Sequence, residues 1–536
     1  MKRSKRLLVV LMALVLILSA CGSSGSDAEG KIIRTNNGSE PGSLDPAMAT
    51  GTHESWVLQH TFQGLMDYDK EGNLTEGVAE SYTVSEDGLN YVFTLKDGIK
   101  WSNGDPVVAG DFEYAWKRLL DPDLGADYAF QLYYVKGGEA YNSGKASVDD
   151  VMVKAKDEKT LEVELEKPTP YFIDLTAFYS MYPVNQKVVE ANPDWAKDAS
   201  THVSNGAFKL EKWEHNSIIS LRKNPEFQYA DQVKIAGIDL DIIEEASTAY
   251  AKYEGGEYDM LQDIPPEVAA DLIAKKDPDL VESEDVGTYY YNLNSVVSPL
   301  DNVKVRNALS MSIDRQQITE KITKRGEIPA EGIVPYGLMD ENDKDFRESS
   351  GNHIEYNPEK AKELMAEGLK EEGKTIEEMQ FQLMYNTDEN HKKIAEAIQE
   401  MWKKNLGVNI ALTNLEFKDK LEKEKAGDYQ ISRAGWIGDY EDPMTMLDLF
   451  ITDGPFNDTG YSNAEYDKLI DDAKNSADQK VRMDAMRKAE DILMKDMPIV
   501  PVYHYTKNYL VKPNIKGVYK TLLFAPTLTY AEVVED

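Results

Sequence analysis

Hydrophobic and polar positions follow two periods along this chain, and the two periods interleave over most of its length. Residues 91–95 and 161–165 alternate apolar and polar side chains, as in strands with one buried face. Residues 208–210 and 218–221 flank Glu214-His215-Asn216-Ser217, which predicts a hairpin. Strand and helix signals that alternate in this way predict an α/β architecture.

Helical periodicity predicts longer helices over residues 111–120, 303–322, 359–370 and 391–405. In the last of these, Ile394, Ile398 and Trp402 recur on one helix face, so this stripe is predicted to be core. Asp388 lies just before that helix and is a suitable N-cap.

Two segments, 253–260 and 423–431, share one order: the end of a helix, a glycine turn and a short strand. Such a repeated order is expected of two lobes with similar topology, in which the ends of these strands would lie at a common cleft. Coincidence explains the likeness equally well.

The N-terminal end resembles an export signal. A cationic flank precedes twelve apolar residues, 7–18, too few for the roughly 20 that span a bilayer. The segment closes on Leu18-Ser19-Ala20-Cys21, which resembles the bacterial lipobox, in which the cysteine is acylated. We therefore expect a signal peptide at 1–20 and a lipidated Cys21 followed by a flexible Gly/Ser linker to residue 30. An ordinary signal peptide with an incidental cysteine is the alternative.

Composition excludes several classes of protein. The formal charge of −36 repels nucleic acid, so no nucleic-acid partner is expected. Cys21 is the single cysteine, which leaves neither a disulfide nor a cysteine nucleophile in the body. The 30 tyrosines suit a cavity that is polar yet dry.

Catalytic motifs are not found. The chain has no His-Glu-x-x-His and no Gly-x-Ser-x-Gly, and its seven histidines are scattered. Residues 368–375 match the spacing of a phosphate-binding loop, but a charged helix enters it and Glu371-Glu372 would face the phosphates. We interpret this segment as a helix end with Gly373 at the turn. No enzyme activity, metal or cofactor is expected.

Several stretches resemble the family 5 extracellular solute-binding proteins of ABC importers. They are Ala79-Glu80-Ser81-Tyr82, residues 91–95, Gly98 to Phe112, Arg433 to Pro443, Tyr385-Asn386-Thr387 and Ile499 to Tyr505. The stretch from Arg433 is similar to the ligand-contacting segment of the oligopeptide-binding lipoprotein branch. The resemblance implies a two-lobed clamshell of the periplasmic-binding-protein type (class II, peptide-binding) with an additional small domain.

The domain boundaries that the resemblance implies are discontinuous in sequence. Lobe I comprises residues 31–63, 188–286 and 507–536, a small accessory domain comprises 64–187, and lobe II comprises 287–506.

The resemblance also implies a peptide site. Asp439 matches the position that holds the peptide's ammonium, and Arg433 and His391 match positions that can meet its carboxylate. Backbone pairing by strand addition would use the strand that contains Gly435 and Ile437 in one lobe and Gly51-Thr52 in the other. Aromatic side chains near the ligand would be Tyr128, Tyr290, Trp436, Tyr505 and Phe417.

Several positions depart from the family's pattern. Glu424, with Lys425 beside it, stands where some relatives have an additional arginine, and Phe417 stands where relatives have tryptophan. Because of these changes, the sequence does not determine which residues bind the peptide's carboxylate, or which peptide length is preferred. Gly287 and Ile437 occupy positions that form a disulfide in some relatives.

The expected function follows from these residues together. We expect a monomeric, lipid-anchored receptor that captures short peptides outside the cell and passes them to the membrane permease of an ABC importer. Its acidity and linker favour the outer face of a Gram-positive membrane. Murein tripeptide or signalling peptides are alternatives on the same scaffold, whereas nickel is disfavoured by Arg433 and Asp439. A secreted hydrolase and a purely structural surface lipoprotein are the alternatives from other classes.

Overall fold

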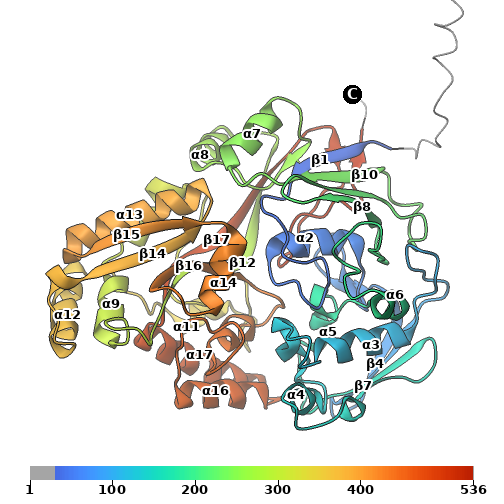
Figure 1. Ribbon diagram of the computed structural model, residues 1–536, viewed down its shortest axis with the longest axis horizontal. Coiled ribbons are helices and arrows are strands. Elements are labelled where there is room, and N and C mark those ends of the chain that lie inside the picture. The colour runs from blue at the N-terminus through green and yellow to red at the C-terminus, as the bar shows by residue number, and fades with distance from the viewer. Residues whose placement is uncertain (1–29, 535–536) are drawn as a thin grey trace, which may run out of the picture.

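The structure is a computed structural model that describes residues 30–534, and the expected signal peptide, Cys21 and most of the linker lie outside these residues. Helices and strands alternate along the described chain, which confirms the predicted α/β class. Three larger sheets occupy different regions of the molecule (Figure 1). Within residues 30–534, no helix combines the length and the apolar character needed to cross a bilayer.

The first sheet holds the start of the described chain. Its strands, in spatial order, are β1 (Ile32–Asn36), β10 (Gly237–Asp241), β9 (Ile218–Lys223) and β8 (Phe208–Glu214). Strands β8 and β9 form the predicted hairpin. Helix α2 (Thr52–Thr61) packs on this sheet, and the Trp56 indole N–H donates to the carbonyl of Pro526 at 2.8 Å. The C-terminal segment is thereby held against the N-terminal lobe.

The second sheet is antiparallel throughout. Its order is β4 (Ala79–Val84), β5 (Asn90–Leu95), β7 (Thr160–Glu164) and β6 (Val153–Ala155), so both strands predicted from alternation are confirmed. Helix α3 (Ala109–Leu119) packs on it through Phe112 and Trp116, which are fully buried. Shorter elements complete this region: β2 (Met66–Tyr68), β3 (Leu74–Glu76), η1 (Asp127–Leu132), α4 (Gly138–Asn142), η2 (Val148–Asp150), α5 (Phe172–Leu175), η3 (Tyr179–Met181) and α6 (Gln186–Ala191).

The third sheet has seven strands and forms the centre of the other lobe. Six of them follow the order β11 (Met260–Leu261), β17 (Ile499–Val511), β12 (Leu280–Leu293), β16 (Ile431–Ile437), β14 (Gln380–Asn386) and β15 (Asn409–Leu415), and β13 (Ile328–Pro329) pairs with β17. The long strands β12 and β17 run from the region of α7 (Ala246–Glu254) and α8 (Pro266–Lys275) into this lobe (Figure 1). Their register is irregular between Glu284 and Thr288.

Helices cover the third sheet and extend below it in Figure 1. They are α9 (Val303–Met311), α11 (Phe346–Ser350), α12 (Pro358–Glu371), α13 (Glu389–Leu406), α14 (Phe417–Lys425), α15 (Met444–Leu447), η6 (Asp448–Phe450), α16 (Ala464–Lys474) and α17 (Gln479–Asp496). Asp388 caps α13 by accepting from the backbone N–H groups of Asn390 and His391, as predicted. Ile394, Ile398 and Trp402 are buried in the core of this lobe, which confirms the predicted stripe.

The motif-like segment 368–375 contains the end of α12, and Gly373 has a φ of +66°, so it is the predicted helix-terminal turn. The two echoed segments also have the predicted order, since α7 leads through Gly256 into β11 and α14 leads through Gly427 into β16. Both strands belong to the seven-stranded sheet.

The prediction of one helix over 303–322 is wrong. Helix α9 ends at Met311, and α10 (Arg315–Gln317) starts after Asp314, whose carboxylate accepts from the Gln317 N–H. A π-helical turn, η4 (Ile318–Thr323), follows. The Arg315 guanidinium donates to the Ser310 carbonyl oxygen at 3.1 Å. In a continuous α-helix, this carbonyl would accept from the backbone N–H of residue 314. The new cap and this side-chain contact therefore interrupt the apolar period.

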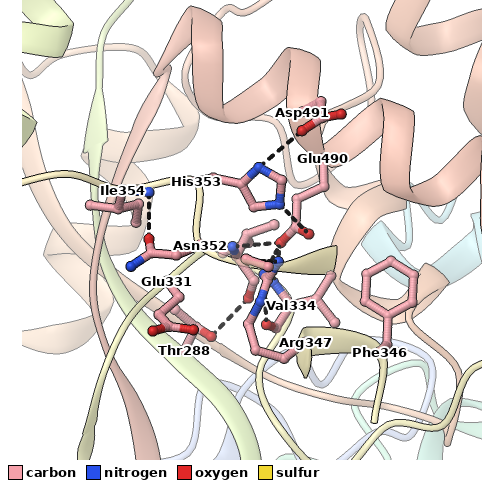
Figure 2. Close-up of polar contacts among 12 residues, drawn as sticks. Thr288, Glu331, Val334, Phe346, Arg347, Asn352, His353, Ile354, Glu490 and Asp491 are labelled. Atoms are coloured by element: carbon pink, nitrogen blue, oxygen red, sulfur yellow. Dashed lines mark hydrogen bonds and ion pairs between the residues drawn. The ribbon is translucent and has the colours of Figure 1, made fainter. Parts of the chain in front are cut away.

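A buried ion pair joins α11 to α17 beneath the third sheet (Figure 2). Arg347 and Glu490 are both fully buried and approach to 2.5 Å. The backbone N–H groups of Ile333 and Val334 each donate to the same Glu490 oxygen at 3.0 Å. Glu490 Oε2 lies 3.4 Å from His353 Nε2. Burial alone would raise the pKa of Glu490, but His353 and Arg347 lower it to about 2.

Candidate functional site

Strand β16 has an open edge. It pairs with β12 along its whole length, from Ile431 opposite Leu293 to Ile437 opposite Gly287. On the other side β14 pairs only with Ile431 and Ser432. From Arg433 to Ile437, no described strand covers that second side, so the predicted strand is present with backbone groups available to an extended ligand.

Asp439 lies two residues beyond the end of this edge and is 6% exposed. Its carboxylate accepts from Gln131 Nε2 at 2.9 Å and from the Tyr128 hydroxyl at 3.3 Å. Within residues 30–534, no lysine or arginine forms an ion pair with it. Burial and the charge of Asp448 raise the pKa of Asp439 well above the usual range of aspartate. The site thus contains a buried acid that lacks a cation.

Arg433 lies at the start of the open edge. It donates from Nη2 to the Tyr505 hydroxyl at 3.0 Å, and its guanidinium carbon is 4.7 Å from the centre of the Tyr289 ring. Its Nε is buried and has no hydrogen-bond partner. No carboxylate of the described chain pairs with Arg433, so this cation is held by aromatic rings and keeps a donor for a ligand.

Gly435 allows this arrangement. A Cβ at that position would lie 2.3 Å from the Tyr505 hydroxyl, so a side chain there would displace the ring that positions Arg433.

His391 lies close to Arg433. The His391 ring, in the first turn of α13, is 5.6 Å from the same Tyr289 ring, and its Nδ1 is buried without a hydrogen-bond partner. Burial and the charges of Arg433, Lys420 and Arg325 lower the pKa of His391 well below its usual range. His391 is therefore a neutral group among cations, and the structure brings it and Arg433 together.

Arg325 belongs to this cluster and is missed by the sequence analysis. Its Nε and Nη2 are buried and have no hydrogen-bond partner. It follows the π-helical turn within Lys324-Arg325-Gly326, which has the composition of an ordinary polar turn. The sequence contained no signal for it.

Aromatic rings line the acid end of the edge. The Tyr128 and Trp436 rings lie 5.0 and 4.8 Å from that of Phe456, and the Trp436 indole nitrogen is buried without a partner. Gln131, the second donor to Asp439, is also missed by the sequence analysis. Its spacing of three residues from Tyr128 along a helical turn was a usable signal.

The remaining predicted aromatics lie around the strand. Tyr290 is opposite Ala434 in the β12–β16 pair and packs 6.0 Å from Phe450. Phe417 begins α14, and its ring is 5.7 Å from that of His53, which comes from the other lobe. Phe417 therefore lies where the two lobes approach each other.

Gly51 and Thr52 do not form the expected strand-like stretch. Gly51 is extended, but it is the N-cap of α2, and its carbonyl accepts from the Ser55 N–H at 3.0 Å. Thr52 is the first helical residue. Glu54 in the first turn favours this helix start, so only Gly51 could offer extended backbone to a ligand.

Gly287 and Ile437 face each other in the β12–β16 pair, and a Cβ on Gly287 would lie 2.6 Å from the Ile437 side chain. Across residues 30–534, no three His, Cys, Asp or Glu side chains gather as a metal ion would require.

Comparison with known proteins identifies the scaffold. The family model described as "Bacterial extracellular solute-binding proteins, family 5 Middle" matches residues 73–458 of this chain. The chain belongs to family 5 of these solute-binding proteins. The resemblance noted in the sequence is thus confirmed, and the protein is a solute-binding component of an importer rather than an enzyme.

Relatives within family 5 cover nearly the whole chain. The oligopeptide-binding protein OppA of Bacillus subtilis is 42% identical over 536 residues, 97% of each chain. The structure of Listeria monocytogenes OppA bound to peptide has a TM-score of 0.89 at 33% identity, covering 95% of this chain and 100% of that one. The murein tripeptide-binding protein MppA of Escherichia coli has a TM-score of 0.88 at 33% identity, covering 95% and 99%. These likenesses confirm the two-lobed fold.

Proposed function

We propose that this protein captures short peptides between its two lobes and delivers them to the membrane permease of an ABC importer. The observation that carries the proposal is a pair of opposite charges at the two ends of one open strand edge. Among residues 30–534, Asp439 is a buried acid without a cation, and Arg433 is a cation without an acid.

A peptide zwitterion complements these features. Its ammonium would pair with Asp439, its carboxylate with Arg433, Arg325 and His391, and its backbone with the open edge. The edge from Arg433 to Ile437 spans about 16 Å at roughly 3.3 Å per residue, which suits a short extended peptide. A peptide is also bound in the Listeria relative, which supports the same class of ligand.

Thermal unfolding of the protein with a panel of peptides tests the proposal. A ligand at a hundredfold excess over its Kd adds about 2.7 kcal/mol to the free energy of unfolding. We expect stabilisation by free peptides, and a large loss of it on N-acetylation or C-amidation. No stabilisation by any peptide would contradict the proposal. Stabilisation by a murein tripeptide alone would favour the function that the name of MppA describes.

The domain boundaries proposed from the sequence fit a hinge within β12 and β17. The boundaries at 286/287 and 506/507 coincide with the irregular register between Glu284 and Thr288, which pair with Thr506 and His504. Two strands that change register at one level can bend there while the lobes close, which supports the boundary proposed between lobe I and lobe II.

The proposal includes a monomer anchored by a lipid on Cys21, on the outer face of a Gram-positive membrane. Leu18-Ser19-Ala20-Cys21 and the Gly/Ser stretch after it support the anchor. Cys21→Ser should release the protein into the medium with its peptide binding intact, and retention of that variant in the membrane fraction would contradict the lipid anchor.

A further inference from the structure

Glu424 is a second buried acid near the cleft, and one of its oxygens has no partner. The side chain is 3% exposed on α14, and Lys420 Nζ lies 2.6 Å from Oε2. Oε1 is buried and accepts no hydrogen bond. A buried acceptor without a donor is costly, so the described contacts leave this oxygen unexplained.

Asp458 provides a second carboxylate beside Glu424. Its carbonyl accepts from the Tyr429 hydroxyl at 2.7 Å, but its side chain makes no hydrogen bond or ion pair with residues 30–534. Burial and the charge of Glu424 raise the pKa of Asp458 to about 7.

The lysines nearby are already engaged. Lys420 is paired with Glu424, and Lys425 is paired with Asp127 of η1. Among residues 30–534, these pairs leave the Asp458 carboxylate without a lysine or arginine of its own.

The end of α14 that holds Glu424 adjoins the Asp439 end of the proposed peptide site, because Lys425 pairs with Asp127. Burial and the charges of Glu424 and Asp458 raise the pKa of Tyr290, which is opposite Ala434 on the strand with the open edge. Asp127 directly precedes Tyr128, which donates to Asp439. Glu424 and Asp458 thus act electrostatically on a side chain at the middle of the edge.

We propose that Glu424 and Asp458 form a subsite for the cationic side chain of a lysine or arginine residue in the bound peptide. The inference rests on the proposed function and deepens it. A ligand ammonium or guanidinium would donate to Glu424 Oε1 and to the Asp458 carboxylate, which accept no hydrogen bond from residues 30–534.

Tripeptides that differ in one side chain test the subsite. The set is lysine, norleucine or glutamate at the central position, with both termini free, and the readout is the ratio of Kd values. Wild-type protein should bind the lysine peptide about tenfold or more tightly than the norleucine peptide. Asp458→Asn and Glu424→Gln should each bring this ratio close to one while the norleucine affinity changes about twofold or less.

Asp428→Asn is the matched control, since Asp428 is an exposed acid that pairs with Lys423 on the outside of the same helix end. It should keep the wild-type ratio. If Glu424→Gln disturbs folding through Lys420, Asp458→Asn decides alone, because the Asp458 side chain has no hydrogen-bond or ion-pair partner within residues 30–534 to lose. The lysine preference should also increase from about pH 6 to about pH 8 as Asp458 ionises against Glu424, Lys420, Asp127 and Lys425.

A lysine-to-norleucine ratio near one in wild-type protein, with both peptides bound, would overturn the subsite and leave the peptide function standing. Equal loss of the lysine and norleucine peptides in Asp458→Asn would also overturn it, because that result assigns Asp458 to the peptide's own ammonium. Failure of every peptide to bind would overturn the proposed function, and the subsite with it.

Discussion

Two buried clusters of charge differ in one respect, which is whether each charge meets its opposite. Beneath the third sheet, Glu490 meets Arg347, His353 and two backbone N–H groups (Figure 2). Along the open edge of β16, Asp439 is buried and Arg433 is half-buried, yet neither pairs with an opposite charge in the described chain.

The difference separates structural charge from binding charge. Removing a charge from water is costly unless a partner replaces the solvent. Where the partner comes from the chain, the charges stabilise the fold. Where it is missing, the cost persists until a ligand supplies the partner, so the cleft charges lower stability and raise affinity.

The largest expected effect is loss of stability in Glu490→Gln. This change leaves the Arg347 guanidinium buried without a counter-charge, and we expect a loss of about 3–5 kcal/mol in the free energy of unfolding. Urea denaturation measures it. The folded fraction should keep its peptide affinity.

The same pair sets an acid limit to stability. Because the pKa of Glu490 is lowered to about 2 from an ordinary 4.5, its contribution is present above pH 4.5 and is lost as pH falls toward 2. Glu490→Gln should lack this dependence. A variant with wild-type stability would show that the buried pair contributes nothing net.

Asp439→Asn should have the opposite pattern. Affinity for free-amine peptides should fall about 100-fold, equivalent to about 2.7 kcal/mol, because the ammonium loses its counter-charge. Stability without peptide should stay constant or rise, since the carboxylate is costly when unpaired. Calorimetric titration and thermal unfolding measure the two effects. Unchanged affinity would remove Asp439 from the ammonium site.

The sequence predicted one of these clusters and not the other. Asp439, Arg433 and the strand between them follow from a motif that is contiguous in the chain. Glu490 lies far in sequence from Arg347 and His353 and meets them only because α17 packs against α11 and the segment after it, so no local pattern indicated this cluster. Arg325 was missed for the same reason.

In two predicted elements, local hydrogen bonds determine a structure that differs from the one expected from the sequence. The apolar spacing over 303–322 was helical, but the Asp314 cap and the Arg315 contact to Ser310 divided the segment. Thr52 was expected in an extended stretch and begins a helix, because the Gly51 carbonyl starts the intrahelical hydrogen bonds. Periodicity predicts the buried face of an element better than its ends.

Arg325→Met should weaken binding of peptides with a free carboxylate about tenfold, equivalent to about 1.4 kcal/mol. The corresponding C-amidated peptides should bind wild type and variant alike, which makes amidation the internal control. The effect is smaller than that of Asp439→Asn because Arg433 and His391 remain at the same end of the edge. Equal losses for free and amidated peptides would indicate a packing role for Arg325.

The smallest effect concerns like charges that the lobes bring together. Glu244, after β10, accepts from the Ser39 hydroxyl at 3.1 Å and faces Glu416 at the start of α14 in the other lobe. Burial and the charge of Glu416 raise the pKa of Glu244 from 4.5 to about 7, and Glu245 adds a further negative charge. The lobes therefore meet through a carboxyl group that binds its proton tightly.

A raised carboxyl pKa means that the folded protein binds the proton more tightly than the unfolded chain, so stability falls as pH rises from 4.5 through 7. Glu244 is partly exposed, which reduces the effect to about 1 kcal/mol. Glu244→Gln should remove this fall in thermal unfolding, whereas Glu86→Gln, an exposed control, should keep it. Because Glu244 and Glu416 belong to different lobes, peptide affinity should weaken over the same pH range in wild type and less in Glu244→Gln. If stability responds to pH and affinity does not, the contact survives in the open form, and lobe closure does not create it.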